Sequence, residues 1–543
     1  MKNSNKVAAK ARYIVALTVC LLLSCSDDYL EEIPKGFLSP ENTFVSKVGF
    51  ESAVADLYRV SRSIISQDGL PGMVSAERDK TMEALYFDGT DFGWFNDKVL
   101  FMADYSTFNS FNATPQNFWI TFYTMIKGAN IILTRSESDL MVWDSESDKL
   151  EIQAKARFFR AWAYRYLVHL YGGVPLIDGE ISGPKLDFMR ASKEETLNFI
   201  VADLEFATQY LPVANDRDGT VSKAAADHLL AEIYMTQGEY DKSIEAASRI
   251  IDDPQYELMT TRFGNYSQEP GDVFWDLFRL GNQNNSANKE VILAWQMEYN
   301  VPGGEAVLRL QRIWGPFLER LLDPDGKPAL QKDQFLGRPV AFSRISHYLE
   351  YQIWESDWDN DIRNSEYNMQ RSFYVNNPAS AHFGEKIIPK PSDTIRAHFA
   401  YITKITHVHG APQGYDVTGR IFKDVYAMRL AETYLLRAEA YLYKGDLDKA
   451  AADINVVRGR ANATPVDPAD VDIDYILDER ARELVTEEPR RLTLVRVGKL
   501  HERVKKYNPV SGPTIQEFHS LWPIPQTEID SNLGAELTQN PGY

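Results

Sequence analysis

The clearest helical pattern of hydrophobic positions lies at residues 152–170. Apolar side chains recur there at steps of three and four residues, which is the period of an α-helix. Phe158 and Trp162 make the neighbouring faces apolar as well, so this helix is predicted to be buried among other helices. The Gly-Gly pair at 172–173 tolerates the left-handed conformation of a helix end, and Pro175 prevents continuation. We therefore predict one buried helix that ends at this glycine pair.

The same helical period appears in segments 43–61, 115–136 and 193–210. An internal repeat follows, because residues 229–242 (LLAEIYMTQGEYDK) match residues 436–449 (LRAEAYLYKGDLDK) at a constant offset. Small Ala where helices cross, large Tyr and Leu beside it, and Gly at the turn are typical of tetratricopeptide helix pairs. Such pairs cannot bury their apolar faces alone, so the two copies are predicted to stack in one scaffold.

A long segment of different character separates the two copies of the repeat. Residues 252–419 are rich in Asn, Gly, Pro and aromatic residues and lack sustained periodicity. Long irregular segments on a rigid scaffold commonly carry binding sites. The predicted fold is mostly α-helical, a tetratricopeptide-like repeat scaffold with a long irregular insertion that carries short strands.

The N-terminal residues have the pattern of an export signal. Four basic residues precede the apolar run 14–23, which is too short to span a bilayer, and Ser24-Cys25 follows it directly. This order predicts a signal peptide at 1–24 and lipidation of Cys25, followed by an extended linker at 25–42. Several acyl chains on one residue would attach the chain firmly to a membrane.

Composition and motifs exclude several classes of function. The formal net charge of −19 and the lack of a long Lys/Arg run argue against nucleic acid binding. The sequence has no cysteine pairs at zinc spacing and no nucleophile-elbow, zinc-protease, P-loop or dinucleotide-binding motif. The adjacent acids at 252–253 and 487–488 point apart, so surface charge explains them better than acid–base catalysis.

Several motifs together resemble the SusD-like (RagB/SusD) nutrient-binding lipoproteins of Bacteroidetes. They are RFFRAWAYRYL at 157–167 with YGGVPLI at 171–177, the Asn-rich turn at 282–288 leading to Glu-Val-Ile, Asp361-Ile-Arg363, the Glu-Arg-rich segment at 476–500, and the closing Pro-Ile-Pro and Gln-Asn-Pro-Gly-Tyr. The resemblance covers nearly the whole chain after the leader. The sequence departs from the family pattern at Pro489, Leu492 and Leu494, where the family often has Gly, Trp and Asp.

The resemblance implies a domain order and a function. It implies a helical N-terminal part at 43–251, a ligand-binding insertion at 252–419, and a C-terminal part at 420–543 that completes the scaffold. It also implies a non-catalytic protein of the outer membrane, held by lipid and facing the cell exterior. In polysaccharide utilization and nutrient uptake, such a protein captures a glycan and passes it to a SusC-like TonB-dependent transporter. Two alternatives stay open: a peptide-binding receptor of the RagB type and a glycan-degrading hydrolase.

Candidate ligand-binding residues come from aromatics that stand beside Gly, Asp, Asn or Arg in irregular segments. Protein sites for sugars pair flat aromatic side chains with polar groups that bind the hydroxyls. The competing explanation is that each tryptophan holds its own loop, since Trp is highly buried on average. The candidates are Asp91, Trp94, Phe95, Asn96, Arg312, Trp314, Trp354 and Trp358.

No cofactor is expected, although the sequence contains two weak metal-binding patterns. His407 and His409 would share one face of a strand, but no third ligand is evident, so no metal site is predicted there. Asp357-Trp-Asp-Asn-Asp361 imitates the start of a calcium loop without its glycine and its final glutamate. Irregular coordination of a structural calcium ion by these acids stays an open alternative.

Overall fold

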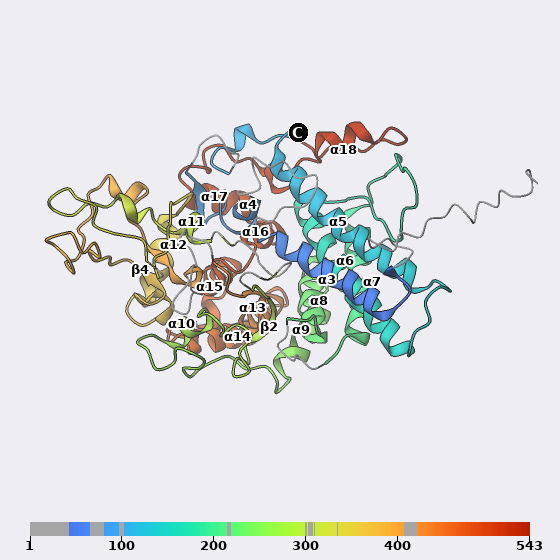
Figure 1. Ribbon diagram of the computed structural model, residues 1–543, viewed down its shortest axis with the longest axis horizontal. Coiled ribbons are helices and arrows are strands. Elements are labelled where there is room, and N and C mark those ends of the chain that lie inside the picture. The colour runs from blue at the N-terminus through green and yellow to red at the C-terminus, as the bar shows by residue number, and fades with distance from the viewer. Residues whose placement is uncertain are drawn as a thin grey trace, which may run out of the picture.

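The computed structural model describes residues 43–65, 81–96, 102–213, 219–298, 301, 308, 310–333, 335–406 and 421–543 (Figure 1). The predicted signal peptide, the linker at 25–42, Cys25, His407 and His409 lie outside the described residues.

The described residues are mostly helical, as the sequence pattern predicts. The helices are α3 (Lys47–Ser63), α4 (Thr81–Tyr86), α5 (Ala113–Ser136), α6 (Glu146–Tyr171), α7 (Lys193–Tyr210), α8 (Lys223–Gln237), α9 (Tyr240–Ile251), α10 (Val273–Leu277), α11 (Leu310–Trp314), α12 (His347–Glu350), α13 (Leu430–Tyr443), α14 (Leu447–Arg460), α15 (Ile473–Leu484), α16 (Arg490–Arg496), α17 (Leu500–Tyr507) and α18 (Gln526–Ser531). The yellow and orange segments around α12 gather at the end of the molecule opposite α5 and α7 (Figure 1).

Helix α6 is the buried helix that the periodicity predicts. Its first turn is capped by the Ser145 side chain, which accepts a hydrogen bond from the Asp148 backbone N–H. The helix ends at Gly172, whose φ of 73° lies in the region that favours glycine. A Cβ atom at Gly173 would lie 2.1 Å from the carbonyl oxygen of Ala191, so only glycine fits there. Helices α5 and α7 pack on its two sides.

The two copies of the repeat form two helix pairs, α8–α9 and α13–α14. Helix α13 packs against α14 and also against α8 and α9, so the pairs stack although the insertion separates them in sequence. Ala231 and Ala438, the matching small residues, are both fully buried. Gly238 and Gly445 occupy the two turns with φ near 79° and 76°. The predicted fold class is confirmed.

Among the residues that the structure describes, three short antiparallel sheets connect the insertion to itself and to the scaffold. β1 pairs with β3, β2 pairs with β6, and β4 pairs with β5. The pairing of β2 and β6 joins a strand inside the insertion to a strand that follows it, immediately before α13 begins. The strands are β1 (Gly93–Phe95), β2 (Val291–Trp295), β3 (Ser343–Ile345), β4 (Met369–Gln370), β5 (Tyr401–Ile402) and β6 (Val425–Arg429).

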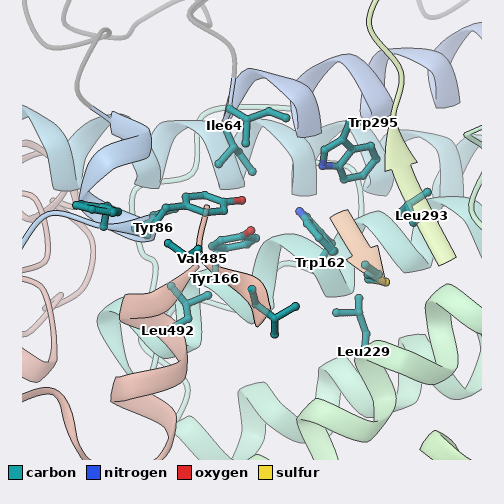
Figure 2. Packing of buried hydrophobic residues seen from close by; sticks show 14 of the residues in the cluster. Ile64, Tyr86, Trp162, Tyr166, Leu229, Leu293, Trp295, Val485 and Leu492 are labelled. Carbon is teal, nitrogen blue, oxygen red and sulfur yellow. The ribbon is translucent and has the colours of Figure 1, made fainter. Parts of the chain in front are cut away.

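The hydrophobic core runs through the junction of these elements (Figure 2). Trp162 of α6 meets Trp295 of β2 edge to face, with ring centroids 5.6 Å apart. Leu229 of α8 and Leu492 of α16 lie in the same cluster (Figure 2). The core therefore contains residues from the N-terminal helices, the insertion and the C-terminal helices, which explains how one scaffold positions the insertion.

A buried network of arginine and glutamate side chains adds polar connections between the insertion and α14–α15. Arg363 of the insertion donates to Glu479 at 2.7 Å and to Glu483 at 3.0 Å. Arg429 and Arg460 also pair with Glu483, and both pair with Glu290 next to β2. Removing one partner from such a network leaves a buried charge uncompensated, which costs about 3–5 kcal/mol.

None of the helices in the described part of the chain combines the length and apolar composition needed to cross a bilayer.

Candidate functional site

The predicted site residues at 91–96 are mostly structural. The carboxylate of Asp91 is fully buried and accepts hydrogen bonds from Arg490 at 2.7 Å and Arg503 at 2.8 Å. Burial alone would raise the pKa of Asp91, but the two guanidinium groups lower it below its usual value. This aspartate is therefore a partner of the C-terminal helices, and the expectation that it binds ligand is wrong.

Phe95 needs the same correction, whereas Trp94 and the half-buried Asn96 stay candidates. Phe95 is buried and stacks on Phe342 with centroids 6.1 Å apart. The Asn96 side chain donates to the carbonyl of Ala341 at 2.7 Å. Trp94 is half-buried in β1, opposite Arg344 of β3.

Two of the three tryptophans expected in the insertion belong to the core. Trp314 is fully buried and lies 5.6 Å from the ring of Phe87. Trp354 is 1% exposed, and its indole N–H donates to the carbonyl of Leu349 at 3.0 Å. A large apolar ring is stabilised by burial, and neither indole offers a free face to a ligand. Arg312, beside Trp314, is half-buried, and its backbone carbonyl bonds the backbone N–H of Val340. We therefore withdraw Trp314 and Trp354 from the ligand-binding set.

Trp358 is the predicted tryptophan that lies on the surface. It is 42% exposed and stacks with Tyr351, which is 37% exposed; the ring planes are 8° from parallel and the centroids 6.2 Å apart. The guanidinium of Arg371 lies 4.8 Å from the Trp358 ring centroid and 5.8 Å from that of Tyr351. We call these three residues the Tyr351–Trp358 platform. It joins two flat apolar faces to one planar cation on the surface of the insertion.

The platform is fixed by hydrogen bonds beneath it. Arg371 donates through Nη2 to the carbonyl of Glu350 and to the side-chain oxygen of Asn364, both at 2.7 Å. Asn364 in turn donates to the carbonyl of Trp358 at 2.8 Å. Burial lowers the pKa of Arg371 from its ordinary value, which still leaves the group charged at neutral pH. The arrangement is therefore held in place before any ligand arrives, which reduces the entropy cost of binding.

Local chain geometry explains why Tyr351 and Trp358 meet. Helix α12 ends at Glu350, and the 3-10 helix η5 (Gln352–Asp357) carries the chain from Tyr351 to Trp358. The Ser346 side chain caps α12 by accepting from the Leu349 backbone N–H at 3.2 Å. One short turn thus sets Trp354 inward and Trp358 outward.

The two buried acids around Trp358 are paired with arginines. Asp357 accepts from Arg458 at 2.7 Å, and Asp361 accepts from Arg363 at 2.7 Å. Burial would raise the pKa of Asp357, but hydrogen bonds from Thr464 and Ser356 and the charge of Arg458 lower it to about 2. Two of the three acids expected for an irregular calcium site are therefore held in ion pairs, and the third, Asp359, is exposed. Among the described residues, no group of three or more His, Cys, Asp or Glu side chains is arranged to hold a metal ion.

Sequence reasoning missed Tyr351 and Arg371. The seven-residue spacing of Tyr351 and Trp358 was a readable signal, because an intervening helical turn can bring such residues onto one face. Arg371 gave no local signal, since it reaches the platform through the packing of β4 and its preceding turn.

Comparison with known protein families gives two matches on this chain. Residues 389–543 match the model of the SusD family, and residues 29–235 match a model described as starch-binding associating with outer membrane. The Tyr351–Trp358 platform lies between the two matched segments.

Individual relatives agree with these matches. A SusD-like protein of Formosa agariphila is 26% identical over 97% of this chain and 99% of its own length. The starch-binding protein SusD of Bacteroides thetaiotaomicron is 25% identical over 74% of each chain.

Solved structures show the same fold. Surface glycan-binding protein A from Bacteroides thetaiotaomicron in complex with laminarihexaose has a TM-score of 0.66 at 20% identity, over 91% of this chain and 99% of that one. A SusD homolog from the same organism has a TM-score of 0.70 at 18% identity, over 93% and 98% of the two chains. This chain belongs to the SusD-like family.

Proposed function

We propose that this chain is a non-catalytic receptor on the cell surface that binds an oligosaccharide at the Tyr351–Trp358 platform. The observation that carries the proposal is the pair of parallel, exposed rings with a fixed guanidinium beside them. Sugars present apolar C–H faces that stack on aromatic rings. The Nη groups of Arg371 already donate to protein oxygens beneath the platform, so this cation acts by fixing the two rings rather than by binding hydroxyls. Stacking of a flat ligand on one aromatic side chain is worth about 1–3 kcal/mol, by analogy with base stacking.

Trp94 is the second candidate contact of the proposed glycan site. Its strand β1 pairs with β3, which leads through Ser346 directly into α12 and Tyr351. Arg344, opposite Trp94, pairs with Glu350 at 2.9 Å, and the Glu350 carbonyl accepts from Arg371. This series of contacts connects Trp94 to the platform through one rigid segment.

The acids of the platform favour binding without cleavage. Glycoside hydrolysis needs one carboxylic acid that is protonated at working pH and a second carboxylate opposite it. With its pKa near 2, Asp357 would not hold a proton at neutral pH, and Asp361 is neutralised by Arg363. Neither buried acid next to Trp358 can therefore serve as a general acid.

Delivery to a SusC-like TonB-dependent transporter completes the proposal. The family description places related chains at the outer membrane, and two of the relatives named above are a starch-binding protein and a surface glycan-binding protein. The predicted leader and the lipidation of Cys25 would hold the receptor at that membrane. A Cys25→Ala variant is expected to leave the membrane fraction or to remain an uncut precursor; normal membrane attachment would contradict the lipid anchor.

Glycan binding without cleavage is tested by one screen on the chain without its leader. Laminarihexaose, maltohexaose and an array of other oligosaccharides are tested for binding, together with a library of short peptides. Each bound sugar is then incubated with the protein and its length is measured by chromatography. The proposal predicts that at least one oligosaccharide class binds and keeps its length. Binding of peptides alone would favour the RagB-type alternative, and shortened sugars would favour a hydrolase.

A further inference from the structure

A groove with a cavity of about 850 Å³ lies between α5, the segment 175–188 and α18, far from the platform (Figure 1). Its floor is one face of α5, made by Ile120, Tyr123, Lys127 and Ile131 at steps of three and four residues. Helices α3 and α6 cover the other faces of α5. On this face Ile120, Tyr123 and Ile131 are half-buried and Lys127 is exposed, so a mostly apolar helix face lacks a packing partner there.

The walls of the groove are held in place by specific hydrogen bonds. Arg135 binds Glu180 through two hydrogen bonds of 2.7 and 2.9 Å. Tyr123 donates to the carbonyl of Pro175 at 2.8 Å. On the other side, Phe188 and Asn532 exchange two hydrogen bonds of 2.8 Å. A groove built in this way is open before a partner arrives, which favours binding by a rigid surface.

The rim of the groove exposes more apolar surface than a small ligand would cover. Met189 is 73% exposed and follows Phe188 of the wall, and Leu533 is 80% exposed and follows Asn532. Ile181 of the wall is 43% exposed and Leu186 is 48% exposed. Exposed apolar side chains gathered near a cavity are typical of protein–protein contact surfaces.

A carboxylate lies at one end of the groove. Glu528 of α18 accepts a hydrogen bond from the indole of Trp119 and forms no ion pair with the residues that the structure describes. Burial raises the pKa of Glu528 above its ordinary value, and the indole hydrogen bond opposes that rise. Asp530 and Glu536 are further exposed acids of the same wall region, in a chain of formal net charge −19. The α18 end of the groove is therefore acidic, although Lys127 adds an exposed cation to the floor. This end is complementary to a basic group of a partner rather than to the acidic surface of a second copy of this chain.

We propose that this groove binds a segment of the partner transporter. The segment carries an apolar residue next to a Lys or Arg: the apolar side chain enters the groove, and the basic group pairs with Glu528. The inference rests on the proposed function, because it names the surface by which the receptor meets its transporter. Trp119 and Arg135 mark the two ends of the floor, and sixteen residues of helix span about 24 Å. An extended segment of about seven residues has that length, at 3.3–3.6 Å per residue.

Site-specific photocrosslinking in the native host tests the groove. A photoreactive phenylalanine analogue replaces Ile181 at the rim, and the same analogue at Phe383, exposed in the insertion, is the matched control. Crosslinked peptides are identified by mass spectrometry. The expected result is a crosslink from position 181 to a loop of an outer-membrane barrel protein that contains an apolar residue beside Lys or Arg. Crosslinks to another copy of this chain, to free peptides, or to nothing would overturn the proposal.

Charge variants separate this inference from the glycan proposal. Glu528→Gln should lower the crosslinked fraction about tenfold or more, because it removes one partner of a partly buried charge pair. Glu528→Lys should lower it further, and a Lys→Glu change in the crosslinked loop should restore it. Oligosaccharide affinity should stay unchanged in both Glu528 variants. Trp358→Ala should give the converse result, with lost sugar affinity and normal crosslinking. An unchanged crosslinked fraction in Glu528→Gln would overturn the assignment of the basic contact.

Discussion

Tyr240 and Tyr443 stack on each other with ring centroids 5.3 Å apart and planes 10° from parallel. Tyr240 begins α9 of the first repeat, and Tyr443 ends α13 of the second repeat. Next to them, Lys444 pairs with Asp241. The contact joins two segments that the whole insertion separates in the sequence. It shows that the repeats form one scaffold, from which the insertion projects.

Enlarging the small residue at the crossing of the repeats should destabilise this scaffold. Ala438 of α13 is fully buried, so Ala438→Leu is expected to lower the free energy of unfolding by about 1–3 kcal/mol through overpacking. Val456→Leu, on an exposed face of α14, is the control and should change it by less than about 0.5 kcal/mol. Urea denaturation measures both. Equal small effects would mean that the helix pairs do not meet as described.

The buried network behind the insertion should be sensitive to loss of one charge. Glu483 is fully buried and accepts from Arg363, Arg429 and Arg460. Glu483→Gln should cost about 3–5 kcal/mol of stability, because it leaves arginine charges uncompensated. Glu502→Gln, which removes an exposed partner of Lys499, should cost less than about 1 kcal/mol. A Glu483→Gln protein as stable as the parent chain would contradict the network.

Stability should fall in mildly acidic solution because of His169. Burial lowers the pKa of His169 to about 4, and its ring bonds the carbonyl of Arg165 at 2.7 Å. Since the unfolded chain binds a proton near pH 6.5 and the folded chain does not, this contribution is complete above pH 6.5 and is lost as pH falls toward 4. The free energy of unfolding lost through protonation of His169 is up to about 3 kcal/mol.

A His169→Gln variant provides the comparison for the pH dependence. Gln keeps a donor for the Arg165 carbonyl but does not titrate. The unfolding free energy of the variant should therefore depend less steeply on pH between 6.5 and 4 than that of the parent chain. Identical pH profiles for the two proteins would show that His169 does not control this dependence.

Much of the scaffold could be predicted because its signals are local. The bounds of α7 agree with the predicted segment 193–210, since a capping box at Ser192 and Glu195 begins that helix. The repeat and its glycine turns could likewise be predicted from the sequence. Each of these features depends on residues within one or two helical turns.

The candidate site could be predicted only in part, because burial depends on distant contacts. Trp354 and Trp358 are four residues apart and look alike in sequence, yet one is buried and one is exposed. Asp91 stands in a loop typical of binding sites, but its partners Arg490 and Arg503 come from the C-terminal helices. No local pattern in the sequence indicates such a partner, so the platform could be identified only in the folded structure.

Replacing the platform's guanidinium by an ammonium should weaken glycan binding. Arg371→Lys keeps the charge but loses the planar fork that binds Glu350 and Asn364, so affinity should fall several-fold, or by about 1 kcal/mol. Arg320→Lys is the control, because Arg320 also lies over an aromatic ring, Phe317, in an exposed part of the insertion. Calorimetry with the oligosaccharide found in the screen measures both. Equal affinities would exclude Arg371 from the site.

The proposed function is tested most directly by comparing Trp358→Ala with Trp354→Ala. For each variant, the melting temperature and the calorimetric affinity for the identified oligosaccharide are measured together. Trp358→Ala should lose affinity by about ten- to a hundredfold with little change in melting temperature, since its ring is exposed. Trp354→Ala should instead lose about 3–5 kcal/mol of stability, because its ring is buried. Unchanged affinity in Trp358→Ala, in a protein that still binds the sugar, would contradict the proposed site.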